Sequence, residues 1–458
     1  MKKITLGAGT GYWGVPIDFP RELVERAQLD YLGIELLAEL TMSILQRMKM
    51  RNPKLGYIPD LLEFMKVVLP HCVKKGTKIV TNGGGTNPAQ AAKEVGKIIK
   101  ELGLPPMKIG VIEGDDMMDR IDDYLERGNK LANMDTGETD IQVIKDRIVS
   151  AHAYIGADRV ADALKEGADI VIGGRLSDNA LYVGPIMYEF GLSYDNPDDI
   201  DKIGAAITTG HIIECGEWVT GGSSNFWETV KEPWNIGMPI AEFFENGEAI
   251  ITKTPDSGGL LTVNTVKEHL VYETHDPKKY IMPDGVADLT TLKLEEVGKD
   301  RIKVSNMTGS KRPEHLKMQI GYHDGYLAEL MMLVPWPKAI SKAKRYEEIV
   351  RERFKKFNIE PLDLRFDMIG VNALHGELSP IPIDENTINE IGFRVAAKLR
   401  TKKEAYLVRR FVIGGALCTG PVGTAFNAPN KEREIIALWP TLIPREEVKT
   451  TLTMIEGE

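Results

Sequence analysis

Residues 78–88 read KIVTNGGGTNP: a short run rich in β-branched residues, three successive glycines, and a proline at the start of a helical stretch. This order of strand, glycine loop and helix is typical of one βα unit in a parallel sheet. Glycine lets backbone amides approach an anion closely, and a helix N-terminus favours negative charge. We therefore predict an anion site here, although a tight turn capped by Asn82 would carry the same residues. The residues of this predicted site are Asn82, Gly83, Gly84, Gly85 and Thr86.

Further βα units surround this one in the first 200 residues. The predicted strands are Ile4–Leu6, Tyr31–Ile34, Lys78–Thr81, Ile109–Ile112 and Asp169–Ile172, and the predicted helices are Ala89–Leu102 and Arg159–Glu166. Gly103 and Gly167 follow the two helices as C-cap signals. Parallel strands place their ligand crevice at their carboxyl ends, so we expect functional residues in the loops after the strands.

The pattern changes near residue 204. The predicted elements beyond it are a helix at Ala205–Cys215, strands at Ala249–Thr252, Leu260–Val266, Arg301–Val304, Leu364–Gly370 and Gly392–Leu399, and helices at Ala343–Phe357 and Ala405–Ala416. The predicted fold is α/β, with a mostly parallel sheet built from βα units. We expect three domains: an α/β domain over 1–204, a β-rich domain over 205–338 and a small α+β domain over 339–458.

Composition and charge exclude several classes of protein. With 458 residues, 43% of them hydrophobic, the chain is long enough for a large core. Its formal net charge of −10 provides no basic stripe for nucleic acid. The three cysteines form no CxxC pair, which argues against disulfides and thiolate metal sites. The first apolar run breaks at Gly7 and no run spans a bilayer, so we expect a cytoplasmic protein without membrane segments.

Two loops after predicted strands carry acid, base and cation side chains. Asp115 and Asp116 follow the strand KIGVIE, where a carboxylate serves as an acid or base, as a metal ligand, or as a helix cap. In the loop GGRLSDN, the Arg175 guanidinium matches a substrate carboxylate, or it pairs with Asp178. Asp178 is a candidate base or metal ligand, and Ser177 lies between them as a substrate-binding residue.

A third cluster lies in GHIIECG. His211 and Glu214, at i and i+3, lie on one face of the predicted helix, where they share a proton relay or a metal, or satisfy each other in a core. Together with Asp115 and Asp116 they suit Mg²⁺ or Mn²⁺ without requiring either. No Gly-x-Ser-x-Gly elbow is present, so serine hydrolase chemistry has no support.

Gly9, Gly11 and Gly14 formally match a dinucleotide fingerprint, with Glu35 placed as the ribose-binding acid. Pro16 and the short helical stretch that follows argue against this interpretation.

The following motifs occur in this order along the chain: GAGTGYWG, LGIELLAELTM, TNGGGTNP, EGDD, AYIGADRVADALKEGADIVIGGRLSDNAL, GHIIECG with TGG, and SGGLLTVNTVKEHLVYETHDPKKYIMPD. This series, from Ile4 to Asp284, resembles the acyclic terpene utilisation protein A family. The resemblance implies a catabolic enzyme acting on a small branched carboxylate or its CoA thioester. It also implies that Gly83–Gly85, Arg175, Asp178, His211 and Glu214 line one site, and that a small companion protein completes some members.

The combination of an anion-binding glycine loop, an arginine for a carboxylate, and Asp, Glu and His side chains for proton transfer favours a hydratase or dehydratase. Its substrate would be a small branched acid or its CoA thioester. In this scheme Asp178 or Asp115 takes the α-proton, and His211, oriented by Glu214, protonates the leaving hydroxyl. A nicotinamide-dependent oxidoreductase and a scaffold subunit completed by a small partner are the alternatives. We expect a homo-oligomer, as for most large metabolic enzymes.

Overall fold

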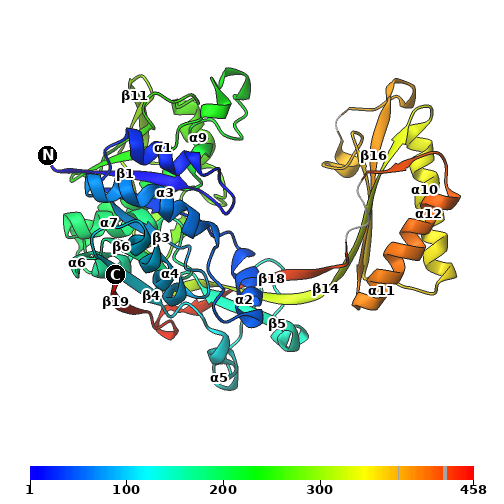
Figure 1. Ribbon diagram of the computed structural model, residues 1–458, viewed down its shortest axis with the longest axis horizontal. Coiled ribbons are helices and arrows are strands. Elements are labelled where there is room, and N and C mark those ends of the chain that lie inside the picture. The colour runs from blue at the N-terminus through cyan, green and yellow to red at the C-terminus, as the bar shows by residue number, and fades with distance from the viewer. Residues whose placement is uncertain (380, 427–430, 458) are drawn as a thin grey trace. The chain divides into compact units, whose positions relative to one another are not determined.

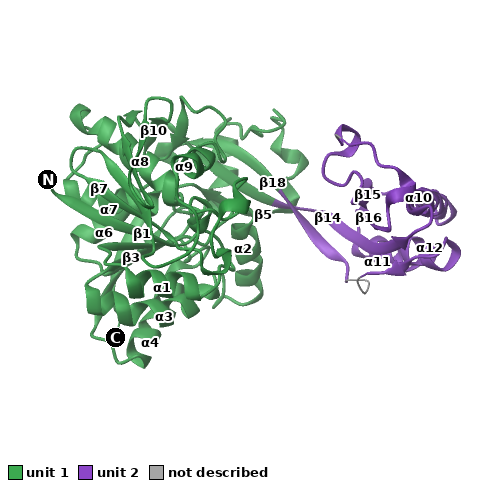
Figure 2. Cartoon of the chain, turned by 90° about the horizontal axis from the view of Figure 1, so that it is seen from above, with its two compact units in different colours: residues 1–321, 438–458 green, residues 322–437 purple. Residues whose placement is uncertain are grey.

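The computed structural model describes residues 1–379, 381–426 and 431–457. They form two compact units, which are coloured separately in Figure 2: residues 1–321 with 438–458, and residues 322–437. Two strands, β14 (His315–Pro335) and β18 (Arg433–Pro444), contribute residues to both units. The chain therefore returns to the first unit after building the second.

The first unit is built on a sheet of ten strands. In spatial order they are β11 (Lys293–Gly298), β12 (Arg301–Ser305), β8 (Ala249–Lys253), β7 (Pro239–Phe244), β1 (Lys3–Thr10), β2 (Tyr31–Ile34), β3 (Lys78–Thr81), β6 (Ile170–Gly173), β4 (Met107–Glu113) and β19 (Thr451–Gly457). The run from β1 to β4 is parallel, which confirms the predicted βα units. The remaining pairs are antiparallel, so the sheet is mixed and the prediction of a mostly parallel sheet is wrong.

Hairpins explain the difference. Short connections join β7 to β8 and β11 to β12, and tight connections of this kind permit only antiparallel pairing. These strands extend the N-terminal sheet across β1 instead of forming a sheet of their own. A separate three-stranded sheet contains β13 (Thr308–Ser310), β10 (Gly285–Asp288) and β9 (Tyr280–Met282).

Helices cover both faces of the large sheet, as the labels in Figure 1 allow the reader to follow. Adjacent strand residues face opposite layers: Ile79 belongs to the core cluster that contains residues of the helices at 18–26, 60–75 and 88–101, and Val80 belongs to the cluster that contains residues of the helices at 158–165, 180–190 and 200–213. The helices of this unit are α1 (Asp18–Arg26), α2 (Thr41–Arg51), α3 (Asp60–Lys75), α4 (Pro88–Glu101), α5 (Ile121–Glu126), α6 (Asp158–Lys165), α7 (Ala180–Phe190), α8 (Ile200–Ile213) and α9 (Val263–Leu270). No helix in the described part of the chain is long and apolar enough to cross a membrane.

One predicted strand is a helix. Residues 260–266 were expected to be extended because of their β-branched content, yet α9 begins at Val263. A capping box starts it: the Thr262 hydroxyl accepts the Thr265 amide, and the Thr265 hydroxyl accepts the Thr262 amide. These reciprocal bonds satisfy donors that a helix start otherwise leaves open. Local capping chemistry outweighs β propensity here.

The second unit combines helices with a sheet. Its strands have the order β15 (Asp363–Ile369), β16 (Glu390–Leu399), β14 and β17 (Thr424–Ala425). Strand β18 also pairs with β14, as does β5 (Ile148–Ala153), which belongs to the first unit. Side chains of α10 (Ala339–Lys356) pack on β16, among them Tyr346 against Phe393. The predicted final helix is divided into α11 (Lys402–Leu407), a π-helical turn (Val408–Ile413) and α12 (Gly414–Thr419).

Candidate active site

The carboxyl ends of β1, β2, β3 and β6 meet at one edge of the sheet, because these strands are parallel. Asn82 ties three of the loops together there. Its Oδ1 accepts the Leu36 amide after β2 at 2.8 Å, and its Nδ2 donates to Asp178 after β6 at 3.3 Å. The side chain is completely buried. Asn82 therefore fixes the position of the Asp178 carboxylate relative to the strand ends.

Arg175 and Asp178 form a two-point ion pair. Nη1 lies 3.0 Å from Oδ1 and Nη2 lies 3.3 Å from Oδ2, while the guanidinium stacks at 4.0 Å on the Tyr154 ring. Burial alone would lower the pKa of Arg175, but Asp178 and Tyr154 raise it above its usual value. The Asp178 side chain keeps 26% of its surface exposed, against 3% for Arg175. The arginine is thus a buried support that presents a carboxylate to solvent.

The end of α8 brings a second carboxyl group to this region. Glu214 Oε1 lies 2.7 Å from His211 Nδ1 and 3.3 Å from the Tyr280 hydroxyl. Burial raises the pKa of Glu214, and its Oε2 has no hydrogen-bond partner among the described residues. His211 is fully buried, and its Nε2 faces the Leu270 carbonyl at 3.4 Å. His211 therefore orients the Glu214 carboxyl group from the buried side.

Glu35 is the third carboxyl group, and its prediction as a ribose ligand does not fit its surroundings. Its Oε2 accepts the Cys215 amide at 3.1 Å, and the residue is buried. Burial, followed by the charges of Asp178 and Glu214, raises the pKa of Glu35 well above its ordinary value. Burial and Glu35 also raise the pKa of the Cys215 thiol, which disfavours a nucleophilic thiolate.

Tyr182 lies near the carboxyl groups of Glu35, Glu214 and Asp178, and the sequence did not predict it as a site residue. Its hydroxyl is buried without a partner in the described structure. Burial, followed by the charges of Glu35 and Glu214, raises its pKa. A tyrosine inside a helix as apolar as ALYVGPIMYEF reads as core, so no local signal distinguishes it.

The glycine loop is closely packed within the protein. The amides of Gly83, Gly85, Thr86 and Asn87 donate to oxygens of Thr81, Asn82, Gly56 and Gly84. A Cβ on Gly84 would lie 2.6 Å from the Gly173 carbonyl oxygen of β6. Gly84 is therefore required for the close contact between the loop after β3 and the end of β6. Most amides of the loop already donate to acceptors within the protein. Ser177, in the neighbouring loop, donates to Asn179.

Asp115 lies behind the Arg175 loop. Its Oδ2 accepts the Arg175 amide at 3.0 Å and lies 2.9 Å from His152 Nδ1. His152 was not predicted, and its only signal is its place in SAHAYIG, just before the long AYIGADR motif. Asp116 is exposed and accepts the Met118 amide, which is the helix-cap alternative. Asp115 supports the loop that carries Asp178.

The four proposed metal ligands belong to separate networks. Asp115 contacts His152, whereas His211 contacts Glu214. No three His, Cys, Asp or Glu side chains in the described residues are arranged to hold a metal ion. The arrangement of these side chains does not fit a Mg²⁺ or Mn²⁺ centre.

The dinucleotide fingerprint also lacks its geometry. A Cβ on Gly11 would lie 2.3 Å from the carbonyl carbon of Cys215, so a glycine here allows the backbone that follows α8 to pack closely against residue 11. Helix α1 begins at Asp18, four residues after Gly14, instead of at the last glycine. The nicotinamide-dependent alternative is therefore not supported.

These features define an α/β protein with a cluster of carboxyl groups at the carboxyl edge of parallel strands. Residues 4–454 match the family model described as acyclic terpene utilisation family protein AtuA, and the chain belongs to this family. The match confirms the predicted family and extends it over nearly the whole chain. The family name indicates a role in acyclic terpene utilisation. No curated protein and no solved structure matches the chain.

Proposed function

We propose that this chain is a cytoplasmic hydro-lyase of terpene catabolism that acts on a small branched acid or its CoA thioester. One observation carries the proposal: the solvent-accessible Asp178 carboxylate lies in one cluster with buried carboxyl groups whose pKa values are raised. Titratable groups in such contrasting environments are what paired acid and base catalysis requires.

In the dehydration direction, Asp178 takes the proton on the carbon next to the carbonyl. The bond between the β-carbon and its hydroxyl breaks, and the hydroxyl leaves as water with a proton from Glu214. A new double bond joins the α- and β-carbons. Asp178 ends protonated and Glu214 ionised, and exchange with solvent restores both; hydration is the reverse. His211 and Tyr280 act as positioning residues for Glu214.

The test is proton NMR in D₂O with branched 2-enoic and 3-hydroxy acids, free and as CoA thioesters. Wild-type protein is expected to interconvert one pair and to incorporate deuterium at the α-carbon. Asp178→Asn should lose both activities by about 10²- to 10⁴-fold. Glu214→Gln should lose interconversion but keep α-exchange, because Asp178 remains. The matched control is Asp162→Asn, which removes an exposed carboxylate paired with Arg159.

Retention of full exchange by a folded Asp178→Asn protein contradicts the assignment of the base. A wild-type protein that is silent with every acid and thioester contradicts the hydro-lyase.

A second candidate function is the large subunit of a complex with a small companion protein. Leu374, Leu378 and Ile381 of the second unit are 93%, 87% and 73% exposed. Exposed aliphatic side chains of this kind are typical of interaction surfaces. Turnover that appears only when a protein co-purified from the native host is added would support this candidate. Light scattering would distinguish it from a homo-oligomer that covers the same side chains.

A further inference from the structure

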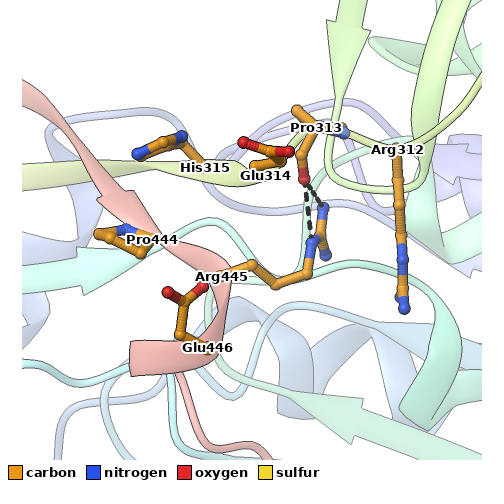
Figure 3. A pocket seen from close by; sticks show the side chains of 7 residues that line it. All are labelled: Arg312, Pro313, Glu314, His315, Pro444, Arg445 and Glu446. Atoms are coloured by element: carbon orange, nitrogen blue, oxygen red, sulfur yellow. Dashed lines mark hydrogen bonds between the residues drawn. The ribbon is translucent and has the colours of Figure 1, made fainter.

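An open pocket of about 490 Å³ lies where β14 begins and β18 ends, and it shares no lining residue with the candidate active site. Figure 3 shows its seven lining residues, which come from two segments distant in sequence, 312–315 and 444–446. Two of them are arginines, Arg312 and Arg445. All seven belong to the first unit.

Backbone carbonyl groups hold Arg445 in place. Its Nε and Nη2 donate to the Pro313 carbonyl at 3.1 and 3.0 Å, and Nη2 also donates to the Pro283 carbonyl. The Arg445 amide donates to the Glu314 carbonyl at 2.9 Å. Carbonyl oxygens orient a guanidinium but carry no net charge to neutralise it. The guanidinium is fixed before any ligand arrives.

Arg312 is fixed by an aromatic ring. Its guanidinium lies 4.4 Å from the centre of Tyr194, and the Tyr194 hydroxyl donates to buried Asp284 at 2.6 Å. Burial, followed by the charge of Arg312, lowers the pKa of Arg445, as expected for two neighbouring cations. Guanidinium groups nevertheless stay charged in proteins.

Neither arginine pairs with a carboxylate in the described part of the chain. Glu314 and Glu446 also line the pocket; in Figure 3 the Glu314 side chain lies beside Pro313, and the Glu446 side chain lies near the main chain of Arg445. Asp284 is not among the lining residues; its Oδ1 accepts the Tyr194 hydroxyl and the Ala157 amide, and its charge partly offsets the lowering of the Arg445 pKa. Asp284 and Asp158 attract the Arg445 guanidinium, but neither lines the pocket.

We propose that Arg312 and Arg445 bind a phosphate group of a small ligand. Because Nε and Nη2 of Arg445 donate to the Pro313 and Pro283 carbonyls, Nη1 of Arg445 and the Arg312 guanidinium are the groups that would donate to the phosphate. Such charge-assisted bonds are stronger than neutral ones. This site does not depend on the proposed hydro-lyase activity.

Isothermal titration of the full chain tests the site with inorganic phosphate, coenzyme A and 3′-dephospho-coenzyme A as probes. We expect saturable binding of at least one probe, weakened about tenfold or more by Arg312→Gln. Arg445→Lys keeps the charge but loses the fork, so it should weaken binding as well. The control is Arg159→Gln, because Arg159 is already paired with Asp162 and should not affect binding.

The three probes identify the source of the phosphate. Binding of coenzyme A but not of its dephospho form assigns the pocket to the 3′-phosphate. Equal binding of both assigns it to the diphosphate, and binding of inorganic phosphate alone assigns it to the free ion. No saturable binding of any probe by the wild-type protein would overturn the proposal, as would equal affinities for wild type and a folded Arg312→Gln variant.

Discussion

Asp178, Glu214 and Glu35 are chemically similar residues, and their surroundings give them different roles. Asp178 is partly exposed and paired with Arg175, whereas Glu35 and Glu214 are buried. Removing a carboxyl group from water disfavours its charged form, which is why the pKa values of Glu35 and Glu214 rise. The distribution of proton-holding and proton-accepting groups is therefore set by burial.

Asp284 provides a measurable consequence of burial for stability. Burial raises its pKa to about 6 from 3.8. Because the folded form binds its proton more tightly, the stabilisation is complete below pH ~4 and is lost as the pH rises through about 6, a change of about 3 kcal/mol. The difference in free energy of unfolding between Asp284→Asn and wild type, measured in urea, should therefore shift in favour of the variant by about 3 kcal/mol from pH ~3.5 to pH ~7.5.

The control for this prediction is Asp288→Asn. Hydrogen bonds from Thr290 lower the pKa of Asp288, so this carboxylate stabilises the folded state above its unfolded pKa and the benefit is lost as the pH falls. Its variant should show the opposite sign. A pH-independent difference between Asp284→Asn and wild type would contradict the burial argument.

Among the elements, the contact between the residues that follow β1 and those that follow α8 leaves no room for an added methyl group. Gly11→Ala would place Cβ against the Cys215 backbone, which cannot rotate away, and should destabilise the fold by about 1–3 kcal/mol. Gly96→Ala is the matched control: it lies inside α4, and its nearest neighbour would be 3.5 Å away. That change should be neutral or stabilising by up to about 1 kcal/mol, because alanine favours helix. Thermal unfolding of both variants gives the comparison, and equal losses would contradict it.

At the scale of the whole molecule, the two units have separate hydrophobic cores. Phe393 is fully buried in the second unit and Phe64 nearly so in the first. Phe393→Ala should destabilise the second unit by about 3–5 kcal/mol and speed amide exchange in β15 and β16. Protection of β1–β3 should remain. Phe64→Ala should give the reverse pattern, and uniform loss of protection in either variant would show one cooperative core.

The sequence by itself determined the βα units, the loops that follow their strands and the family of the chain. These features depend on neighbours within a few residues: Gly103 and Gly167 adopt positive φ after their helices, as the glycine signals predict. The helix predicted at Ala343–Phe357 was predictable for the same reason, since α10 has a long amphipathic pattern. Propensity failed at α9, where a capping box outweighed β-branched content.

Only the tertiary structure decided which side chains meet and which are buried. The Glu35 carboxylate accepts an amide 180 residues away, and His152 reaches Asp115 from a strand outside the large sheet. Strand β19 returns to pair with β4, although nothing near residue 451 in the sequence specifies this partner. Burial sets pKa values and leaves atoms such as the Tyr182 hydroxyl without a partner, and it arises from packing between distant segments. Local sequence patterns carry no record of that packing, which is why Tyr182 and His152 emerged only from the structure.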